Sequence, residues 1–423
     1  MPHWRRTLYT IWFTEFIAIV GFAFVSPFIP YYIQQLGVTD QKEVALWTGL
    51  TMSGNSLSLA IMAPIWGMLA DRYGRKMMVM RATLAGAVLM ALMGFVTNVQ
   101  QLVALRVLQG VFTGTVAAAT TLVVSVVPKQ NSGAALGSLQ MAIYLGTSLG
   151  PLLGGIASDS LGYRSSFWVT GTLLFLSGLL VMFLVQEDFH PIDEATHSRR
   201  LDWRQATQFL FASGGALLAV FAARILLRAG TQILTPMLPL FVQSLSPPAA
   251  RVATVTGIIT GASAVGTAFG SPLIGRWGDR MGHRRLLVAS GLAAALLYLP
   301  QAFAPSTTWL MLWQLLTGFA IGGTLATLTA LLVQFSPQGR EGMIVGLDSS
   351  VAGLANTIGP MVGAGAAAGF GLQTPFILSA GVLGVGTLAV VLWVREGTRQ
   401  GSGKSDPADR GDTSAASATG QRK

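Results

Sequence analysis

Between two long apolar stretches the chain reads Gly67-Met68-Leu69-Ala70-Asp71-Arg72-Tyr73-Gly74-Arg75-Lys76, and 208 residues later it reads Gly275-Arg276-Trp277-Gly278-Asp279-Arg280-Met281-Gly282-His283-Arg284. We expect Gly67 and Gly74 to allow a tight reversal between two helices, at positions where a side chain would clash. Asp71 can lie near a helix N-terminus, where a carboxylate is favoured by roughly 0.3–1 kcal/mol. Each segment therefore predicts a short polar loop that joins two helices.

The two loops belong to a repeat that runs through most of the chain. Pro64 and Pro272 also differ by 208 residues, and Pro128 and Pro337 differ by 209. Two longer pairs keep the shift of 209, namely Ser26-Pro27-Phe28-Ile29-Pro30 with Thr235-Pro236-Met237-Leu238-Pro239, and Gly150-Pro151 with Gly359-Pro360. A nearly constant shift predicts two halves of the same topology, that is, parallel-related repeats.

The composition predicts a membrane protein. Hydrophobic residues make up 52% of the 423 residues and charged residues only 10%, against roughly 25% charged in soluble domains. Apolar stretches of about 20 residues match a hydrocarbon layer of about 30 Å. We expect an all-α polytopic protein with twelve transmembrane helices as two six-helix bundles, at residues 8–35, 44–70, 77–97, 101–127, 134–158, 165–186, 214–243, 252–275, 285–304, 308–334, 342–368 and 373–394.

These spans divide the chain into four parts. Residues 1–186 are predicted to form the N-terminal bundle, 187–206 a cytoplasmic linker, 207–394 the C-terminal bundle and 395–423 a disordered cytoplasmic tail. Nineteen lysines and arginines fall on the side of the N-terminus, against Lys42, Arg164 and Arg251 on the other side. The positive-inside rule therefore predicts cytoplasmic N- and C-termini in the cell (plasma or inner) membrane. We see no cleavable signal peptide, so we expect the first helix to serve as its own insertion signal.

Several functional classes are disfavoured. The net charge of +10 lies in loops between apolar spans, so we expect no nucleic-acid partner. The chain has no cysteine, and its four histidines are scattered without metal-ligand spacing, so we expect no metal site. Gly403-Lys404-Ser405 lacks the earlier glycine of a phosphate-binding loop, so nothing indicates coupling to ATP. We expect no cofactor and no catalytic residues.

With these motifs in place, the chain resembles the major facilitator superfamily up to about residue 395. Residues 67–76 are similar to the signature loop of that family, and Leu102-x-x-x-Arg106-x-x-Gln109-Gly110 is similar to its second motif. Gly146-x-x-x-Gly150-Pro151-x-x-Gly154-Gly155 resembles the motif of the drug/proton antiporter branch. Trp4-Arg5-Arg6, Pro27-x-x-Pro30 and Gln34-x-Leu36-Gly37-Val38 further resemble multidrug exporters of the MdtG type.

The resemblance gives the motifs expected roles. It implies that the loop with Gly67, Asp71, Arg72, Gly74 and Arg75 is a cytoplasmic gate latch, although a hairpin that only sets topology is the alternative. Its second-half copy comprises Gly275, Asp279, Arg280 and Gly282. The antiporter motif implies export rather than uptake. Its glycines permit close helix packing, and Pro151 is expected to bend the helix, so either a packed helix pair or two bending helices between the halves fits.

Charged residues inside the predicted spans are candidates for proton and substrate coupling, because each costs several kcal/mol unless it is paired or hydrated. Glu15 lies in the first span, and its repeat mate is Arg224 in the seventh. In the family these spans line a central cavity, so Glu15 and Arg224 are expected on opposite sides of that cavity. Arg106 is expected nearer the exterior side of the membrane. Asp348 lies in the eleventh predicted span. Alternatively, Glu15 and Arg224 neutralise each other, or each reaches the membrane interface, and Asp348 stabilises a helix start.

We expect six further residues to line the cavity: Phe24, Tyr31, Tyr32, Met141, Tyr144 and Trp313. The leading interpretation is a monomeric secondary transporter that expels small amphipathic, multidrug-like compounds in exchange for protons, with the lipid bilayer, the substrate and protons as its partners. The alternative is a transporter of sugars, organic acids or other metabolites, in which Arg106 and Arg224 bind anions. No Ser-His-Asp set, metal cluster or sensory domain supports an enzyme or a receptor.

Overall fold

The computed structural model describes residues 3–187, 216–247, 250–334 and 341–393, without the side chains of residues 3, 71, 129, 216–219, 333–334 and 341–349. Every element in these ranges is a helix, and long apolar helices alternate with short connections. Most of the predicted linker, at 188–206, and the predicted tail lie outside the described residues, so the proposed division of the chain stays a prediction.

The N-terminal half contains six spans, two of which are interrupted. The elements are α1 (His3–Val25), η1 (Ser26–Phe28), α2 (Ile29–Gln35), α3 (Gln41–Tyr73), α4 (Arg75–Met93), α5 (Val99–Phe112), α6 (Thr115–Val126), η2 (Lys129–Asn131), α7 (Ser132–Leu161) and α8 (Tyr163–Leu184). Elements α1 to α2 form the first span, and α5 and α6 form the fourth span.

The C-terminal half also has six spans in its described residues, with the first one interrupted and the fourth one continuous. Its elements are α10 (Ala216–Leu234), α11 (Leu238–Leu245), α12 (Val252–Met281), α13 (His283–Gln301), α14 (Thr307–Gln334), α15 (Glu341–Phe370) and α16 (Thr374–Trp393). Ten spans in the described ranges are long and apolar enough to cross a membrane. The other two, α3 and α13, are long enough but less apolar, since α3 is rich in serine and glycine and α13 starts with His283, Arg284 and Arg285. The prediction of twelve helices is confirmed.

Glycines make the sharp turns between consecutive helices. Gly74 separates α3 from α4 at φ 94°, and Gly282 separates α12 from α13 at the same φ. This left-handed backbone is rarely open to other residues, so both copies of the loop depend on this glycine. The expectation for Gly67 was wrong, because Gly67 lies inside α3 and a Cβ atom there would meet nothing within 4 Å.

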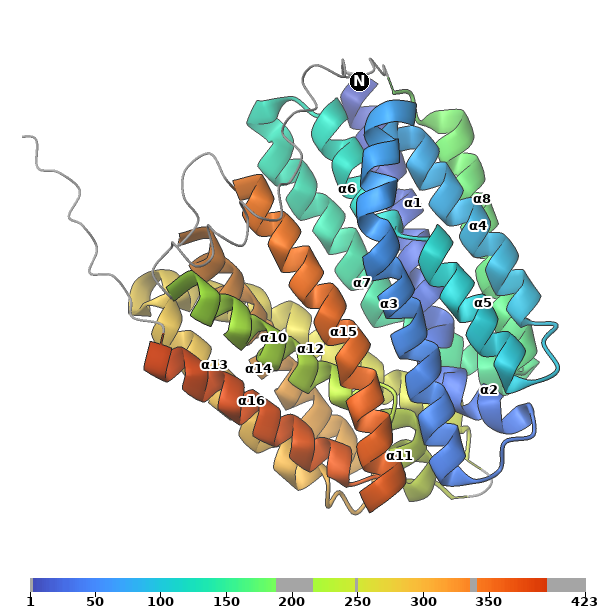
Figure 1. The fold of residues 1–423 in the computed structure, drawn as a ribbon, viewed down its shortest axis with the longest axis vertical. Helices are drawn as coiled ribbons and strands as arrows, with labels where there is room; N and C mark the ends of the chain where they lie inside the picture. The colour runs from blue at the N-terminus through green and yellow to red at the C-terminus, as the bar shows by residue number, and fades with distance from the viewer. Residues whose placement is uncertain (1–2, 188–215, 248–249, 335–340, 394–423) are drawn as a thin grey trace, which may run out of the picture.

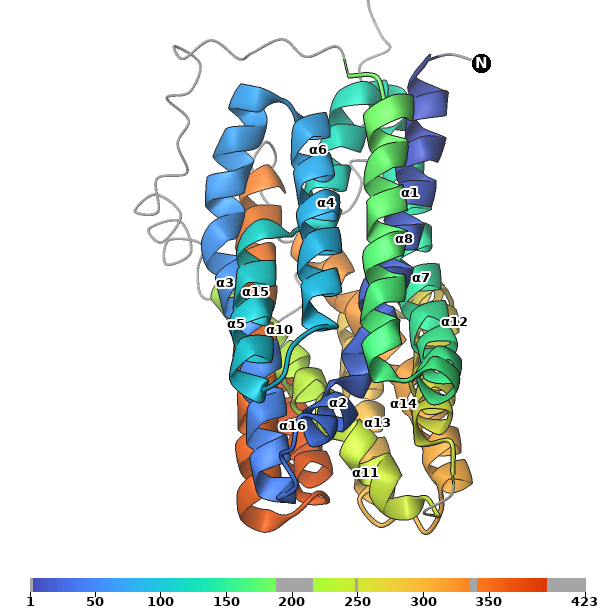
Figure 2. The same ribbon diagram turned by 90° about the vertical axis from the view of Figure 1, so that its right-hand side faces the viewer.

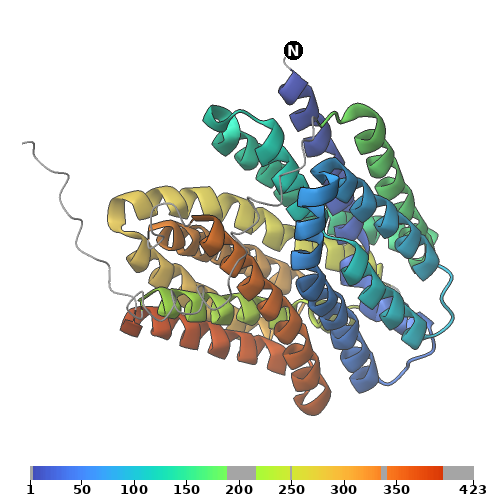
Figure 3. The ribbon, with the colours of Figure 1, turned by 45° about the horizontal axis from the view of Figure 1, so that its top comes forward.

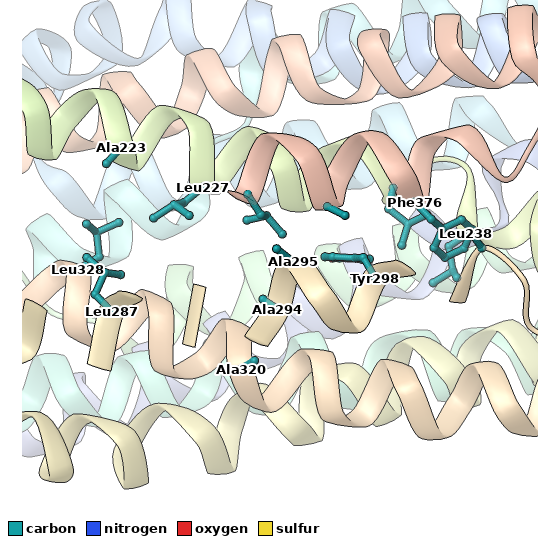
Figure 4. Close-up of a cluster of buried hydrophobic side chains, with 14 of the residues drawn as sticks. Ala223, Leu227, Leu238, Leu287, Ala294, Ala295, Tyr298, Ala320, Leu328 and Phe376 are labelled. Atoms are coloured by element: carbon teal, nitrogen blue, oxygen red, sulfur yellow. The ribbon is translucent and has the colours of Figure 1, made fainter. Parts of the chain in front are cut away.

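Each half packs around its own apolar interior. In the C-terminal half, side chains from α10, α13, α14 and α16 meet in one cluster that includes Leu227, Leu287, Tyr298, Leu328 and Phe376 (Figure 4). In the N-terminal half, one cluster gathers around Tyr32, Met90 and Phe167 and extends to Met237 and Ala364 of the other half. A second cluster forms around α4, α6 and α7. Figures 1 and 3 show the two halves as separate bundles.

The bundles meet through two helix pairs and diverge toward the end that carries the N-terminus. Helix α3 lies beside α15, and α7 lies beside α12 (Figure 2). A Cβ atom on Gly49 of α3 would meet Pro360 and Ala364 of α15, and one on Gly257 of α12 would meet Pro151 of α7. Gly49 and Gly257 are repeat mates, so the two contacts are related by the internal symmetry. We name the side that carries the N-terminus the inner side and the opposite one the outer side; from the loop charges we expect the inner side to be cytoplasmic.

Candidate functional site

A cavity of about 840 Å³ lies between the two halves. It reaches toward the inner side, where Gln140 and Thr329 stand in the inner parts of α7 and α14. Its lining is rich in hydroxyl and amide groups and contains two arginines. The lining residues used below are Gln140, Tyr144, Ser148, Arg224, Arg228, Thr231, Gln314 and Thr329.

Hydrogen bonds between the halves close the outer side. The amides of Gln34 and Gln243, which are repeat mates, bond to each other in both directions at 2.9 and 3.0 Å. The Tyr31 hydroxyl donates to the carbonyl of Pro239 at 2.6 Å and lies 2.8 Å from Thr256 Oγ1. These contacts join the outer ends of α2, α11 and α12, so the cavity is sealed from that side in this conformation.

A carboxylate strengthens the same seal. Asp159, near the end of α7, accepts from the backbone N–H of Thr254 at 2.7 Å, from Thr254 Oγ1 at 2.6 Å and from the N–H of Ala253 at 3.3 Å. These amides belong to the first turn of α12, where backbone donors lack helical acceptors and negative charge is favoured. Asp159 therefore caps a helix of the opposite half, and we name this contact the outer clasp.

The glycines of the antiporter motif face two different helices. A Cβ atom on Gly146, Gly150 or Gly154 would collide with α1, and one on Gly155 would collide with the backbone of Ala253 on α12. The motif thus brings α7 close to α1 within its half and close to α12 across the interface. Its repeat mates Gly359 and Gly363 are packed on α10 in the same way. That α7 and α15 also bend during transport stays a prediction.

Glu15 lies in the middle of α1 and is completely buried. Thr115 Oγ1 donates to its Oε1 at 3.0 Å, whereas its Oε2 has no hydrogen-bond partner in the described part of the chain. Glu15 does not line the cavity and makes no contact with Arg224. The expected arrangement of Glu15 opposite Arg224 across the cavity does not hold in this conformation, because the Glu15 side chain turns toward α6 of its own half.

Arg224 does line the cavity, together with Arg228 one turn further along α10. Arg228 Nε donates to Asn356 Oδ1 of α15 at 3.2 Å. Both arginines also border a side pocket of about 190 Å³ that runs between α10 and α14. Asp348 belongs to α15, but its side chain lies outside the described residues.

Arg106 lies on α5, away from the cavity. It is 7% exposed, and its NH1 donates to Gln109 Oε1 at 3.1 Å, both residues of the second motif. Its backbone carbonyl accepts from Asn55 Nδ2 of α3 at 3.0 Å. Gly110 of the same motif packs on the backbone of Asn55. The motif therefore holds α5 against α3, and Arg106 makes no contact with Glu15.

Of the six residues expected to line the cavity, Tyr144 does so. Phe24 is buried beneath Gly154, Tyr31 belongs to the outer seal, and the Tyr32 hydroxyl donates to the carbonyl of Met93. Met141 is exposed beside the lining residue Gln140, and Trp313 stacks on Trp309. Met141 and Trp313 each lie one position, or about 100° of rotation around the helix, from the lining residues Gln140 and Gln314. The polar lining residues Gln140, Ser148 and Gln314 were missed.

The inner loops place their charged residues at the surface. Arg72 lies over the ring of Tyr73, and the Asp71 side chain lies outside the described residues, so the latch role of this loop stays a prediction. Arg75 begins α4, and its N–H and that of Lys76 donate to Glu187, at 3.0 and 2.7 Å. The sequence reasoning missed Glu187, which caps α4 where Asp71 was expected to act. In the second copy, Arg280 is exposed and Asp279 lies 3.4 Å from His283 Nε2, next to the turn at Gly282.

Comparison with known proteins matches this architecture. The model of the Major Facilitator Superfamily matches residues 11–253 and 220–419. The chain belongs to the major facilitator superfamily. This superfamily member is 34% identical over 381 residues to the multidrug resistance protein MdtG of Salmonella arizonae. The aligned region covers 90% of this chain and 93% of the relative. The chain is 33% identical over the same length to MdtG of Klebsiella pneumoniae, with 90% and 92% covered.

Solved structures of the superfamily share the fold at low identity. The D-xylose–proton symporter superposes with a TM-score of 0.75 at 14% identity and covers 92% of this chain and 98% of its own. The nucleoside transporter NupG gives 0.73 at 16% identity, with 92% and 98% covered. This superfamily member is therefore a multi-pass membrane transporter and not an enzyme. In its described part, no group of three or more histidine, aspartate or glutamate side chains could hold a metal ion.

Proposed function

We propose that this transporter exports small amphipathic compounds across the cell membrane in exchange for protons, and that Glu15 carries the proton. The observation that supports this proposal best is the Glu15 carboxyl group, which is fully buried in mid-span with one oxygen bonded to Thr115 and the other without a partner in the described residues. A carboxyl group in such surroundings is stable with its proton attached, because an unpaired charge there costs several kcal/mol. The MdtG relatives, named as multidrug resistance proteins, support export.

Alternating access supplies the coupling. In the conformation described here, the outer side is sealed and the cavity reaches the inner side, so a compound from that side can bind at the polar lining. Glu15 then exchanges its proton when movement of the halves exposes it. If Glu15 loses its proton toward the inner side and regains it from the outer side, the proton gradient drives the compound outward. The proposal requires the outer clasp of Asp159 to open in each cycle.

A second candidate is transport of organic anions or other metabolites. Arg224 and Arg228 both line the cavity, and a guanidinium group binds carboxylates and phosphates through a fork of parallel hydrogen bonds. Compounds with one anionic group and one apolar group fit this lining, since the side pocket beside the two arginines is bordered by Leu227, Leu325 and Leu328.

Transport assays in inside-out vesicles with an imposed proton gradient test the proposal. We expect a fluorescent organic cation such as ethidium, or an anion such as carboxyfluorescein, to accumulate inside the vesicles only when the gradient is present. Arg224→Ala should reduce transport of the anion more than that of the cation if the second candidate is correct, and should affect both equally if Arg224 has a structural role.

The variant Glu15→Gln keeps the shape of the side chain and removes its ionisation. We expect it to abolish the dependence of transport on the proton gradient, whereas Glu43→Gln, an exposed carboxylate in the first turn of α3, should behave like the wild type. Gradient-driven transport that persists in Glu15→Gln would move coupling to another residue, with Asp348 the next candidate.

A further inference from the structure

The fourth span is broken at the depth of Glu15. Helix α5 ends at Phe112, α6 begins at Thr115, and Thr113 and Gly114 between them are not helical. Thr115, the first residue of α6, is the one whose hydroxyl group donates to Glu15. The carboxyl group of Glu15 therefore lies against the N-terminal end of a helix of twelve residues inside the membrane.

Specific residues hold this break open. Gly114 has φ +120°, a backbone conformation that other residues rarely adopt. In a continuous helix the carbonyl of Val111 would accept from the N–H of Thr115. Here that carbonyl accepts from Trp66 Nε1 of α3 at 2.6 Å, and the Trp66 ring is covered by Arg81 on one side and contacts Phe112. The break thus leaves the N–H of Thr115 without its helical acceptor, and Trp66 supplies the hydrogen bond that the Val111 carbonyl would otherwise lack.

The second half lacks the break. The positions 208 and 209 residues beyond Gly114 are Gly322 and Gly323, and both lie within the continuous helix α14. Thr324, the mate of Thr115, donates to Ala320 in its own helix and to Ser290 of α13. The residue in the place of Glu15 is Arg224. A broken helix thus accompanies the acidic residue, and a continuous helix accompanies the basic residue.

From this contrast we infer that the N-terminal end of α6, with Thr115, is the anion-stabilising part of the proton site at Glu15. The first amides of a helix have no helical acceptors and carry partial positive charge. Half-helix termini of this kind bind anionic groups in other transporter folds. Oε2 of Glu15 is fully buried and has no hydrogen-bond partner among the described residues, so it is the group that the terminus would stabilise once the proton leaves. The inference rests on the proposed function of Glu15 and assigns a positioning role to Thr115 and Gly114.

Other charged groups in the described residues lie elsewhere. On the helices packed against α1, Asp159 is at the outer end of α7, where it forms the outer clasp, and Arg164 is at the outer start of α8. Helix α6 has no charged residue. Arg81 of α4 lies over the Trp66 ring, 3.5 Å from its centroid, and Arg106 of α5 bonds to Gln109. Among the described residues, the Thr115 hydroxyl at the α6 terminus is therefore the group that donates to the Glu15 carboxyl.

Infrared spectroscopy of the full-length protein in lipid nanodiscs tests the inference without a transported compound. The carboxyl C=O band that disappears in Glu15→Gln identifies the protonated Glu15, and its intensity across a pH series gives the pH at half-protonation. Thr115→Val removes one hydrogen bond to the ionised form, so we expect the midpoint to rise by roughly one to two pH units. Thr115→Ser should restore the midpoint. Thr120→Val, on the same helix with its hydroxyl bonded to Val116, should leave it unchanged.

The outcomes separate the two proposals. A midpoint that is equal in Thr115→Val and Thr120→Val overturns the role of α6 and leaves proton coupling by Glu15 standing. A midpoint that rises in Thr115→Val, combined with gradient-driven transport that persists in Glu15→Gln, supports the α6 site and overturns the proposed coupling. A Glu15 band that does not change between pH 5 and 9 overturns both.

Discussion

The outer clasp makes a quantitative prediction about the balance between conformations. Asp159→Asn replaces a carboxylate that accepts three hydrogen bonds from the start of α12, at 2.6 to 3.3 Å. Two of these bonds are short, at 2.7 and 2.6 Å, and each should lose about 1 kcal/mol when the acceptor no longer carries a charge. The loss of about 2 kcal/mol should shift the ratio of outer-closed to outer-open molecules by roughly 30-fold.

Distances between spin labels on the outer side measure this ratio. The chain has no cysteine, so Phe95→Cys and Phe303→Cys place labels at two exposed positions, one in each half. We expect the label distances in Asp159→Asn to move toward a longer, outer-open population. Asp40→Asn serves as the control, because Asp40 is an exposed carboxylate at the N-cap position of α3 whose side chain makes no capping hydrogen bond. Identical distance distributions for Asp159→Asn and Asp40→Asn would refute the role of the outer clasp.

Two further predictions concern the ends of the helices. Gly257→Ala adds a Cβ atom against the Pro151 carbonyl, so we expect it to keep the outer side open and to slow transport at least tenfold. Gly261→Ala, where the nearest atom to the new Cβ is 3.4 Å away, should be tolerated. Equal transport rates in the two variants would contradict this prediction. Glu187→Gln weakens the cap on α4 and should lower the free energy of unfolding by about 1 kcal/mol. Its unfolding temperature should therefore lie below that of Glu43→Gln, and equal unfolding temperatures would show that the cap is not stabilising.

The sequence predicted the architecture because apolar length and repetition are properties of whole segments. Shifts of 208 and 209 residues matched residues that the structure places in equivalent contacts, such as Gly49 with Gly257. The antiporter motif was likewise readable, because glycines at intervals of four residues lie on one helix face and mark a close approach. Its partners, α1 and α12, came from the structure.

Side-chain direction was harder to predict. The repeat correctly matched Glu15 with Arg224, but it could not show that Glu15 turns toward α6 while Arg224 faces the cavity. That difference depends on the break at Gly114, and a glycine in an apolar span is compatible with both a break and a continuous helix, as Gly323 shows. Asp159 and Glu187 were missed because each caps a helix that is distant in sequence, and such a pairing leaves no local pattern.

Proton movement coupled to the flow of a compound tests the central claim most directly. Proteoliposomes that contain the purified transporter and a trapped pH indicator are given an outward gradient of ethidium at equal pH on both sides. The proposed exchange predicts that protons enter as ethidium leaves, so the wild type acidifies the interior in step with ethidium efflux. Glu15→Gln should transport ethidium downhill without a pH change. Ethidium flux in the wild type with no proton movement, or unchanged proton movement in Glu15→Gln, would contradict the assignment of Glu15 as the proton carrier.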